Sequence, residues 1–387
     1  MDMKRTILAL ALLAALTVSP GAGRADGVRP AAQEGPPTPT PLPSPVILPP
    51  ITPTPDGTPT ATPVGGALPA LEPLPADVNP LTGLVMADPD RLNRRPLLVK
   101  ISNYPPLVRP QHGINRADHV WEHIVEGGGT RFTAVYLTED LQRIGSTRSA
   151  RLVDLYLTPI YRGLLAYSGG SIGTMQQMRA QPWFGDRTFS LEEGDDCPMF
   201  CRYEIEGVDF WHTMFASAVA IRESAAALEV DERVDLRGLT FSAEPPPGGT
   251  PYSSIEISYP GTNNYWFYSP YAGKHYRWSE GQEHLDALGD AQVAYTNVVL
   301  IYANHVEDRN VVEDEVSGAS YAVDIQLEGE GPAVVFRSGQ RYDGRWVRPA
   351  PEGMIRLVDA AGNDIPLAPG TTWFHLLPLD HTALWVN

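Results

Sequence analysis

Short runs of apolar residues recur through the middle of the chain, separated by segments with helical spacing. Three runs have the length and composition of buried strands, at 97–101, 132–137 and 164–167. Segments 150–162 and 212–228 place apolar residues about 3.6 positions apart, which predicts amphipathic helices. Strands that alternate with helices favour a mostly parallel or mixed sheet with helices packed on it. Region 77–243 is therefore predicted to be an α/β domain.

A second pattern begins near residue 251, where apolar and polar residues alternate within short segments. Such segments lie at 255–258, 265–268, 276–278, 298–302, 333–336, 346–347, 355–358 and 373–377. Turn residues, including Ser338-Gly339 and Asp343-Gly344, separate several of them. The pattern predicts a β-rich domain over 251–387, built as an antiparallel sandwich or an open barrel. Consecutive proline and glycine residues within 244–250 mark the expected join.

The first 25 residues have the three parts of a secretory signal peptide. Lys4 and Arg5 precede an apolar run over 7–18, and small residues stand at 23 and 25, where a signal peptidase reads. The run is shorter than the roughly 20 residues that span a bilayer, which favours a cleaved signal peptide. An uncleaved anchor is the alternative, and it is the only membrane contact expected. We therefore expect an extracytoplasmic protein, either secreted or associated with the cell envelope.

Residues 26–76 are dominated by proline, threonine, alanine and glycine. Proline fixes the backbone and removes hydrogen-bond donors, so neither helix nor sheet is expected over this length. The segment is predicted to be a disordered, polyproline-like tether between the signal segment and the folded region. A leader without any role is the alternative.

Charge and composition exclude several classes of protein. The 387 residues are 43% hydrophobic, which suffices for a folded core. Lys and Arg total 29 against 46 Asp and Glu, and the net charge of −17 disfavours binding to nucleic acid or to an anionic membrane surface. The sequence has no Walker loop and no G-x-S-x-G elbow, and the histidines at 112, 119 and 123 lack a metal-binding spacing. No cofactor or metal is predicted.

The two cysteines, Cys197 and Cys201, are separated by three residues. In an exported chain such a pair usually oxidises to a disulfide. Two ligands at this spacing would supply at most half of a zinc site. A disulfide, free thiols and a metal site remain open at this point.

Glycine and arginine residues gather where the predicted strands of the first region end. Segments 126–131, 148–151 and 168–171 flank two of these strands, and the last opens a helix. Ligands of α/β sheets bind beyond the carboxyl ends of strands, and a helix start offers free backbone N–H groups. Arginines add bidentate contacts to a carboxylate or phosphate. The candidate ligand-binding residues are Asn103, Arg109, Gln111, Asp118, Arg131, Arg148, Arg151, Ser168, Gly169, Gly170 and Ser171.

Two carboxylates in this interval, Glu122 and Glu126, are candidates for general acid or base chemistry. Asp118 and Glu122 are four residues apart, a spacing that places them on one face if the segment is helical. The alternative is that these carboxylates pair with arginines in a structural network, and that Gly169 and Gly170 only make a strand-to-helix turn. An unpaired carboxylate in an open cleft would favour an enzyme, whereas carboxylates paired to arginine would favour a binding or structural role.

Several of these segments together resemble a known family. The quoted pieces are Arg109-Pro110-Gln111-x-Gly113, Glu126-Gly127-Gly128-x-Thr130-Arg131, Arg148-Ser149-Ala150-Arg151, Phe210-Trp211-His212-Thr213 and His284-x-Asp286. The chain is similar over about residues 77–380 to the YerB-like bacterial envelope proteins, a domain of unknown function with paired N- and C-terminal parts (DUF3048). The resemblance implies a two-part fold outside the cytoplasm and implies no activity. Family members are typically lipoproteins, whereas this sequence has no cysteine near the signal segment.

Three hypotheses for function remain. The first is a tethered binding protein that holds an anionic or glycan ligand of the envelope through the arginine and Gly-Ser loops. In that case Trp266, Trp278 and Trp346 could stack on sugar rings. The alternative is that these tryptophans are buried in the core. The second is a hydrolase or transferase of an envelope polymer with Glu122 or Glu126 as acid or base. The third is an assembly scaffold without a small ligand. Whether the protein is an enzyme stays open.

Overall fold

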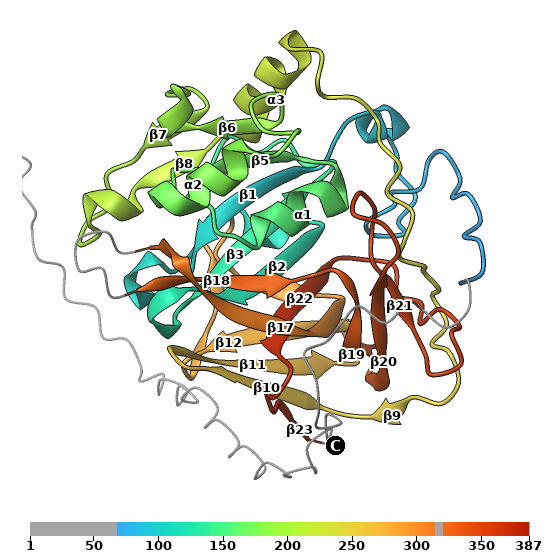
Figure 1. Ribbon diagram of the computed structural model, residues 1–387. Coiled ribbons are helices and arrows are strands. Elements are labelled where there is room, and N and C mark those ends of the chain that lie inside the picture. Colours follow the sequence, from blue (N-terminus) through green and yellow to red (C-terminus); the bar gives the residue numbers. More distant parts are fainter. Residues whose placement is uncertain (1–67, 314–319, 387) are drawn as a thin grey trace, which may run out of the picture. The chain divides into compact units, whose positions relative to one another are not determined.

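Apolar runs from both regions contribute strands to one large mixed sheet in the computed structural model, which describes residues 68–313 and 320–386 (Figure 1). This twelve-stranded sheet has the order β21-β20-β19-β17-β22-β2-β3-β1-β5-β6, with β18 paired to β17 and β9 to β20. Its strands are β1 (Leu97–Ser102), β2 (His119–Ile124), β3 (Thr130–Tyr136), β5 (Leu164–Tyr167), β6 (Thr188–Ser190), β9 (Thr250–Pro251), β17 (Asn297–Val312), β18 (Tyr321–Gln326), β19 (Gly329–Arg337), β20 (Gln340–Arg348), β21 (Arg356–Val358) and β22 (Thr372–Pro378).

Strands of the first region and strands of the second meet inside this sheet. β2 pairs in parallel with β22, in a register that places Trp121 opposite Phe374. β1 is parallel to β5, and β3 is antiparallel to both β1 and β2, so the sheet is mixed, as predicted. All described residues belong to one compact unit. The predicted join at 244–250 is therefore a connection within one folded body.

Three α-helices accompany the sheet within the described residues: α1 (Asp154–Tyr161), α2 (Ile172–Arg179) and α3 (Ala218–Ala227). α1 and α2 pack on one face of the sheet, where Leu157 and Met178 join a core with Leu98 and Leu165 (Figure 1). α3 packs through Ile221 into the core on the opposite face. The helices cover both faces and leave the carboxyl ends of β1 and β5 to loops.

The helix predicted at 212–228 forms only in its second half. Residues Met214–Ala216 are instead a strand, β8, between β4 (Ile144–Gly145) and β7 (Phe200–Arg202). The Ser217 side chain caps the N-terminus of α3 by accepting a hydrogen bond from the amide of Ala220. Three consecutive apolar residues fit a strand as well as one turn of helix, and the cap decides where the helix begins.

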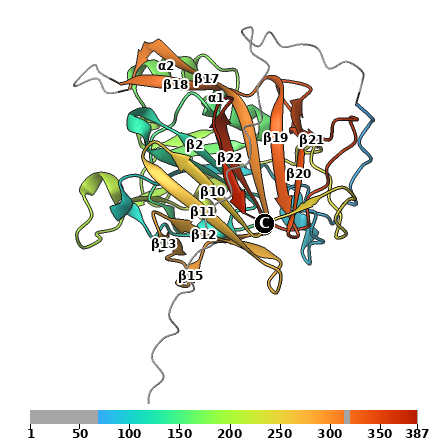
Figure 2. The same cartoon turned by 90° about the horizontal axis from the view of Figure 1, so that it is seen from below.

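A second sheet of six strands packs on the face of the large sheet opposite α1 and α2 (Figure 2). Its strands are β10 (Ser254–Tyr259), β11 (Thr262–Ser269), β12 (Lys274–Ser279), β13 (Gln282–Glu283), β16 (Ala294–Tyr295) and β23 (Leu384–Val386); β14 (Leu285–Asp286) and β15 (Ala291–Gln292) form a separate pair. Trp373 of the large sheet contacts Trp266 of the small one at a ring-centroid distance of 5.2 Å. The β-rich second region with antiparallel sheets is confirmed.

Some predicted features lie wholly or partly outside the described residues. The predicted signal segment and residues 26–67 of the predicted tether are among these. Residues 68–76, the end of the predicted tether, contain no helix or strand, and the carbonyl of Pro69 accepts a hydrogen bond from Arg356 (2.6 Å).

Cys197 and Cys201 form a disulfide. Within 68–313 and 320–386, no helix is long and apolar enough to cross a membrane.

Candidate functional site

The alternation of side chains along β1, β2 and β3 divides the predicted site between the two faces of the sheet. Lys100 on β1 lies opposite Thr133 on β3, and Arg131 on β3 lies opposite His123 on β2, so these side chains share the face that α1 and α2 cover. Glu122 is one residue from His123 and points to the other face. Strand geometry therefore places the Glu122 side chain on the opposite face of the sheet from Arg131.

The segment that carries Glu122 is not helical, because residues His119–Ile124 form β2, so Asp118 and Glu122 do not share a helix face. Four residues along a strand span about 13 Å, so the two carboxylates lie far apart. Asp118 accepts hydrogen bonds from the Asn79 side chain (2.8 Å) and the Leu137 amide (2.7 Å). Burial raises the pKa of Asp118 to about 6. These contacts join Asn79 and Asp118 to Leu137, which directly follows β3. Arg131 stands at the other end of β3, so Asp118 does not belong to the arginine site.

Four cations gather at the end of β1 and in the loop before α1. We call Lys100, Arg131, Arg148 and Arg151 the cationic cluster. The loop is held beside the Gly-Ser turn after β5, because the Ala150 amide donates to the Gly169 carbonyl (2.8 Å) and the Ser168 amide donates to the Arg148 carbonyl (3.1 Å). The three predicted arginines thus meet near the carboxyl ends of β1 and β5, as their spacing predicts. Lys100 was not predicted as part of the site, because it stands in the middle of an apolar run.

Two members of the cationic cluster are ion-paired. The Lys100 ammonium lies 2.9 Å from the Asp154 carboxylate and 2.6 Å from the Thr133 hydroxyl. Burial lowers the pKa of Lys100 to about 8. Arg151 binds Glu126 through two hydrogen bonds, one of them 2.7 Å long from Nε, and its Nε lies 3.5 Å from Glu313. Asp154, Glu126 and Glu313 are therefore the counter-charges of this pair.

Arg131 and Arg148 have no carboxylate within ion-pair distance among residues 68–313 and 320–386. Arg131 is 6% exposed and donates to the Ser149 carbonyl (2.9 Å). Arg148 donates to the Trp211 carbonyl (3.0 Å), and its buried Nε lacks a partner in the same described part of the chain. Burial and the nearby charge of Arg151 lower the pKa of both guanidinium groups. The cluster thus holds four cations beside three carboxylates.

The Gly-Ser turn contributes less than predicted. Ser171 caps α2 by accepting a hydrogen bond from the Thr174 amide (3.2 Å), which confirms that the turn opens a helix. The Gly170 amide, however, donates to the Glu192 carboxylate (3.2 Å). A carboxylate of the protein therefore already occupies one amide that we expected to be free.

Glu126 and Glu122 are both held by arginine. Burial alone would raise the pKa of Glu126, but the hydrogen bond and charge of Arg151 outweigh it and lower this pKa. Glu122 is fully buried beside Arg277 of β12 (3.0 Å). Its oxygens also accept hydrogen bonds from the side chains of Thr130 (2.9 Å), Asn264 (3.0 Å) and Trp373 (3.2 Å). This is the arrangement that favours a binding or structural role over acid–base catalysis.

Three other predicted residues lie near Glu122. Asn103 donates to the Thr130 hydroxyl (2.7 Å) and accepts from Arg109 Nε (3.0 Å), while Arg109 also pairs with Glu280 (3.2 Å). Gln111 donates to the Ser102 carbonyl (2.9 Å). The pair of Arg109 and Glu280 joins the first region to the turn that follows β12 of the small sheet.

Residues of the second region that complete this network were not predicted as site residues. The Asp286 carboxylate accepts from the amides of Gly113 (2.8 Å) and Asn115 (2.7 Å), and His284 contacts Gln111. The family-like sequence His284-x-Asp286 was the available signal. Because Arg277 and Glu122 are separated by 155 residues, no local pattern could pair them.

Comparison of the sequence with protein-family models identifies the family of this chain. The model of the N-terminal domain described as "Protein of unknown function (DUF3048)" matches residues 81–231, and the model of the C-terminal domain matches residues 255–374. The chain belongs to the DUF3048 family. The two matched domains share the twelve-stranded sheet through the pairing of β2 with β22.

A relative of this DUF3048 protein is the Bacillus subtilis protein named "Putative lipoprotein YerB". It is 27% identical over 305 residues, which cover 77% of this chain and 86% of the relative. The crystal structure of YerB from Bacillus subtilis superposes with a TM-score of 0.66 at 24% identity, covering 79% of this chain and 99% of that chain. The likeness establishes a common fold.

Proposed function

We propose that this DUF3048 protein acts outside the cytoplasm as a binding protein of the cell envelope, and that the cationic cluster holds an anionic group of its ligand. The location is supported by the signal-peptide pattern of the first 25 residues and by the lipoprotein name of the Bacillus relative. The observation that carries the proposal is the pair Arg131 and Arg148, which lack carboxylate partners in the described part of the chain.

An uncompensated buried cation destabilises a protein unless a counter-charge or hydrogen bonds satisfy it. Arg131 is nearly buried, and the charges of Glu126 and Glu313 offset only in part its burial and the like charge of Arg151, since its pKa is lowered. A phosphate or carboxylate bound to both guanidinium groups would remove this cost through short, charge-assisted hydrogen bonds. Since the whole chain carries a charge of −17, a local excess of positive charge is the feature that an anion would recognise.

Exposed aromatic residues lie beside the cationic cluster. Trp211, whose carbonyl binds Arg148, is 70% exposed, and its neighbour Phe210 is 61% exposed. The two rings contact each other edge to face at a centroid distance of 5.7 Å. Exposed aromatic side chains next to a charged group suit a ligand that has both a ring face and an anion. A glycan that bears phosphate or carboxylate groups combines these features.

The test measures ligand binding by the full chain and by two arginine variants. Thermal shift and pull-down are performed with inorganic phosphate, glucosamine 6-phosphate and purified wall glycan at low salt. We expect the phosphorylated sugar to raise the melting temperature, and Arg148→Gln to abolish this rise. Arg309→Gln is the matched control, because Arg309 is exposed and paired with Glu307 outside the cluster. Equal melting temperatures with and without each ligand would contradict the proposal, as would equal responses of both variants.

A further inference from the structure

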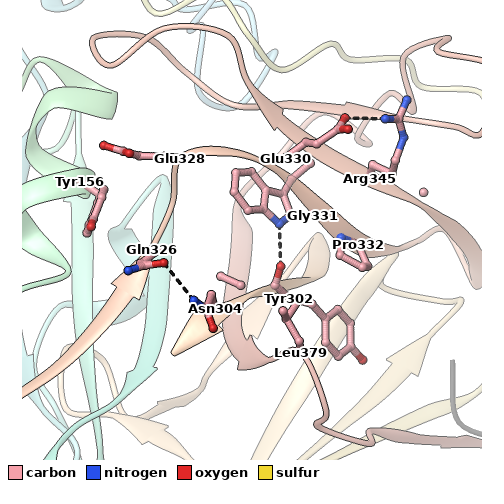
Figure 3. A pocket seen from close by; sticks show the side chains of 13 residues that line it. Tyr156, Tyr302, Asn304, Gln326, Glu328, Glu330, Gly331, Pro332, Arg345 and Leu379 are labelled. Atoms are coloured by element: carbon pink, nitrogen blue, oxygen red, sulfur yellow. Dashed lines mark hydrogen bonds and ion pairs between the residues drawn. The ribbon is translucent and has the colours of Figure 1, made fainter. Parts of the chain in front are cut away.

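A cavity of about 730 Å³ opens where the hydrogen-bond ladder between β17 and its antiparallel partners, β18 and β19, is interrupted (Figure 3). β17 pairs with β19 as far as Ile301 opposite Ala333, and with β18 from Asn304 opposite Gln326. Two residues of β17, 302 and 303, therefore face the six residues 327–332. β18 and β19 together form one partner strand with a large bulge between them. Bulges redirect side chains and are frequent beside functional sites.

Side chains of β20 hold this bulge in place. Trp346 Nε1 donates to the Tyr302 carbonyl (2.8 Å), and Arg348 donates to the Leu327 carbonyl (2.8 Å). Residue 331 is glycine, and a Cβ atom there would lie 2.6 Å from the Trp346 nitrogen. The close packing of Trp346 therefore requires glycine at this position. Because β20 satisfies these backbone groups, the cavity is a built feature, and these carbonyls are not available to an added peptide strand.

The lining of the cavity has a polar and an apolar side. Figure 3 shows Tyr156, Asn304, Gln326 and Glu328 along one side, and Tyr302, Pro332 and Leu379 on the other. Asn304 donates to Gln326 (3.0 Å), which fixes both planar amides and leaves the Asn304 oxygen without a partner in the described part of the chain. Planar amides and carboxylates bind hydroxyl groups that both donate and accept, while an apolar wall packs against C–H groups.

The charge of the lining disfavours anionic ligands. Glu330 is paired with Arg345, whereas Glu328 is exposed and has no ion-pair partner among residues 68–313 and 320–386. The net charge of the lining residues is therefore negative, opposite in sign to the excess charge of the cationic cluster. A carboxylate near the ligand favours an ammonium group or a neutral hydroxyl over a phosphate or uronate.

We propose that this cavity is a second binding site, which takes a carbohydrate unit of neutral or amino-substituted sugars. Its volume lies within the range of about 300–1,000 Å³ found for small-molecule sites. The site shares no residue with the cationic cluster and stands independently of the function proposed for that cluster. An extended peptide is the less suitable occupant, because Trp346 and Arg348 already bind the carbonyls of Tyr302 and Leu327.

Calorimetric titration of the full chain with three disaccharides tests the site. The probes are chitobiose (neutral), the glucosamine disaccharide (cationic) and the galacturonic acid disaccharide (anionic). We expect the first two to bind and the third not to bind. Asn304→Ala should weaken binding about three- to tenfold, as expected for one lost hydrogen bond. Glu328→Gln should reduce the preference for the amino sugar, and Leu379→Trp should block the cavity.

Matched controls separate this site from the cationic cluster and from misfolding. Asn310→Ala changes an exposed asparagine on the same strand outside the cavity and should bind like the unmodified chain. Arg148→Gln should also retain sugar binding, so that the two proposals fail separately. Circular dichroism melting verifies that each variant is folded. The proposal is overturned if neither the neutral nor the amino disaccharide binds, if the uronate binds best, or if folded Asn304→Ala and Leu379→Trp bind as tightly as the unmodified chain.

Discussion

Arg148 donates a hydrogen bond to the carbonyl of Trp211, 3.0 Å away, and thereby ties the loop before α1 to the segment before β8. The contact uses one nitrogen of the guanidinium group. It places a cation without a carboxylate partner, in the described part of the chain, next to the backbone of Trp211, a residue that is 70% exposed. Two segments 63 residues apart are thus joined at the edge of the cationic cluster.

Arg148 and Arg151 should respond differently to the same substitution. Arg151→Gln removes the partner of Glu126 and should lower the free energy of unfolding by about 2–4 kcal/mol. Arg148→Gln loses one hydrogen bond but relieves repulsion from Arg151, so the free energy of unfolding should change by less than about 1 kcal/mol. Urea denaturation in phosphate-free buffer measures both. Similar losses in the two variants would mean that Arg148 is a structural residue.

Glu122 should be essential for stability. Glu122→Gln leaves the buried Arg277 without its counter-charge, and we expect a loss of about 3–5 kcal/mol in the free energy of unfolding. The control is Glu280→Gln, which breaks the less buried pair with Arg109 and should cost less than about 1 kcal/mol. Replacing both Glu122 and Arg277 with apolar residues should recover part of the loss. A Glu122→Gln variant as stable as the unmodified chain would show that the network tolerates an unpaired Arg277.

The fold was predictable where burial leaves a continuous apolar run. β1, β5 and β22 are covered on both faces, so their sequences indicate strands without any knowledge of their partners. β2 was not predicted as a strand, because its sequence, His-Val-Trp-Glu-His-Ile, includes three polar residues that are buried by long-range contacts. The parallel pairing of β2 with β22 joins residues about 250 positions apart, and local periodicity carries no information about it.

The candidate site was predictable in part for the same reason. Arg131 stands at the start of β3, opposite the last residue of the antiparallel strand β1, and the loop with Arg148 and Arg151 lies beside the Gly-Ser turn that follows β5. The meeting of these three arginines therefore follows from the topology of the sheet. The period of two along a strand then places Glu122 on the other face. The cavity beside β17 arises from the register of three strands, which only the pairing itself reveals.

Acid should destabilise the protein through histidines that are partly or fully buried, such as His305. Burial lowers the pKa of His305 to about 4, below the value of 6.5 for an exposed imidazole. The unfolded chain therefore binds a proton first, and the stability that this histidine contributes above pH 6.5 is lost as the pH falls toward 4. His305→Gln should reduce the loss over this window by as much as about 2 kcal/mol, measured by urea denaturation at several pH values. An unchanged pH profile in the variant would contradict this assignment.

The disulfide between Cys197 and Cys201 should contribute little to global stability. It closes a loop with a sequence separation of 4, and the loss of chain entropy on closing so short a loop corresponds to about 2 kcal/mol at most. Replacing both cysteines with serine should therefore leave a folded protein whose free energy of unfolding is lower by about 2 kcal/mol or less. Reduction of the unmodified chain should produce the same change, and reductant should have no effect on the double variant. A much larger loss would indicate that the bond stabilises more than its own loop, for example the β7 strand that begins at Phe200 and pairs with β8.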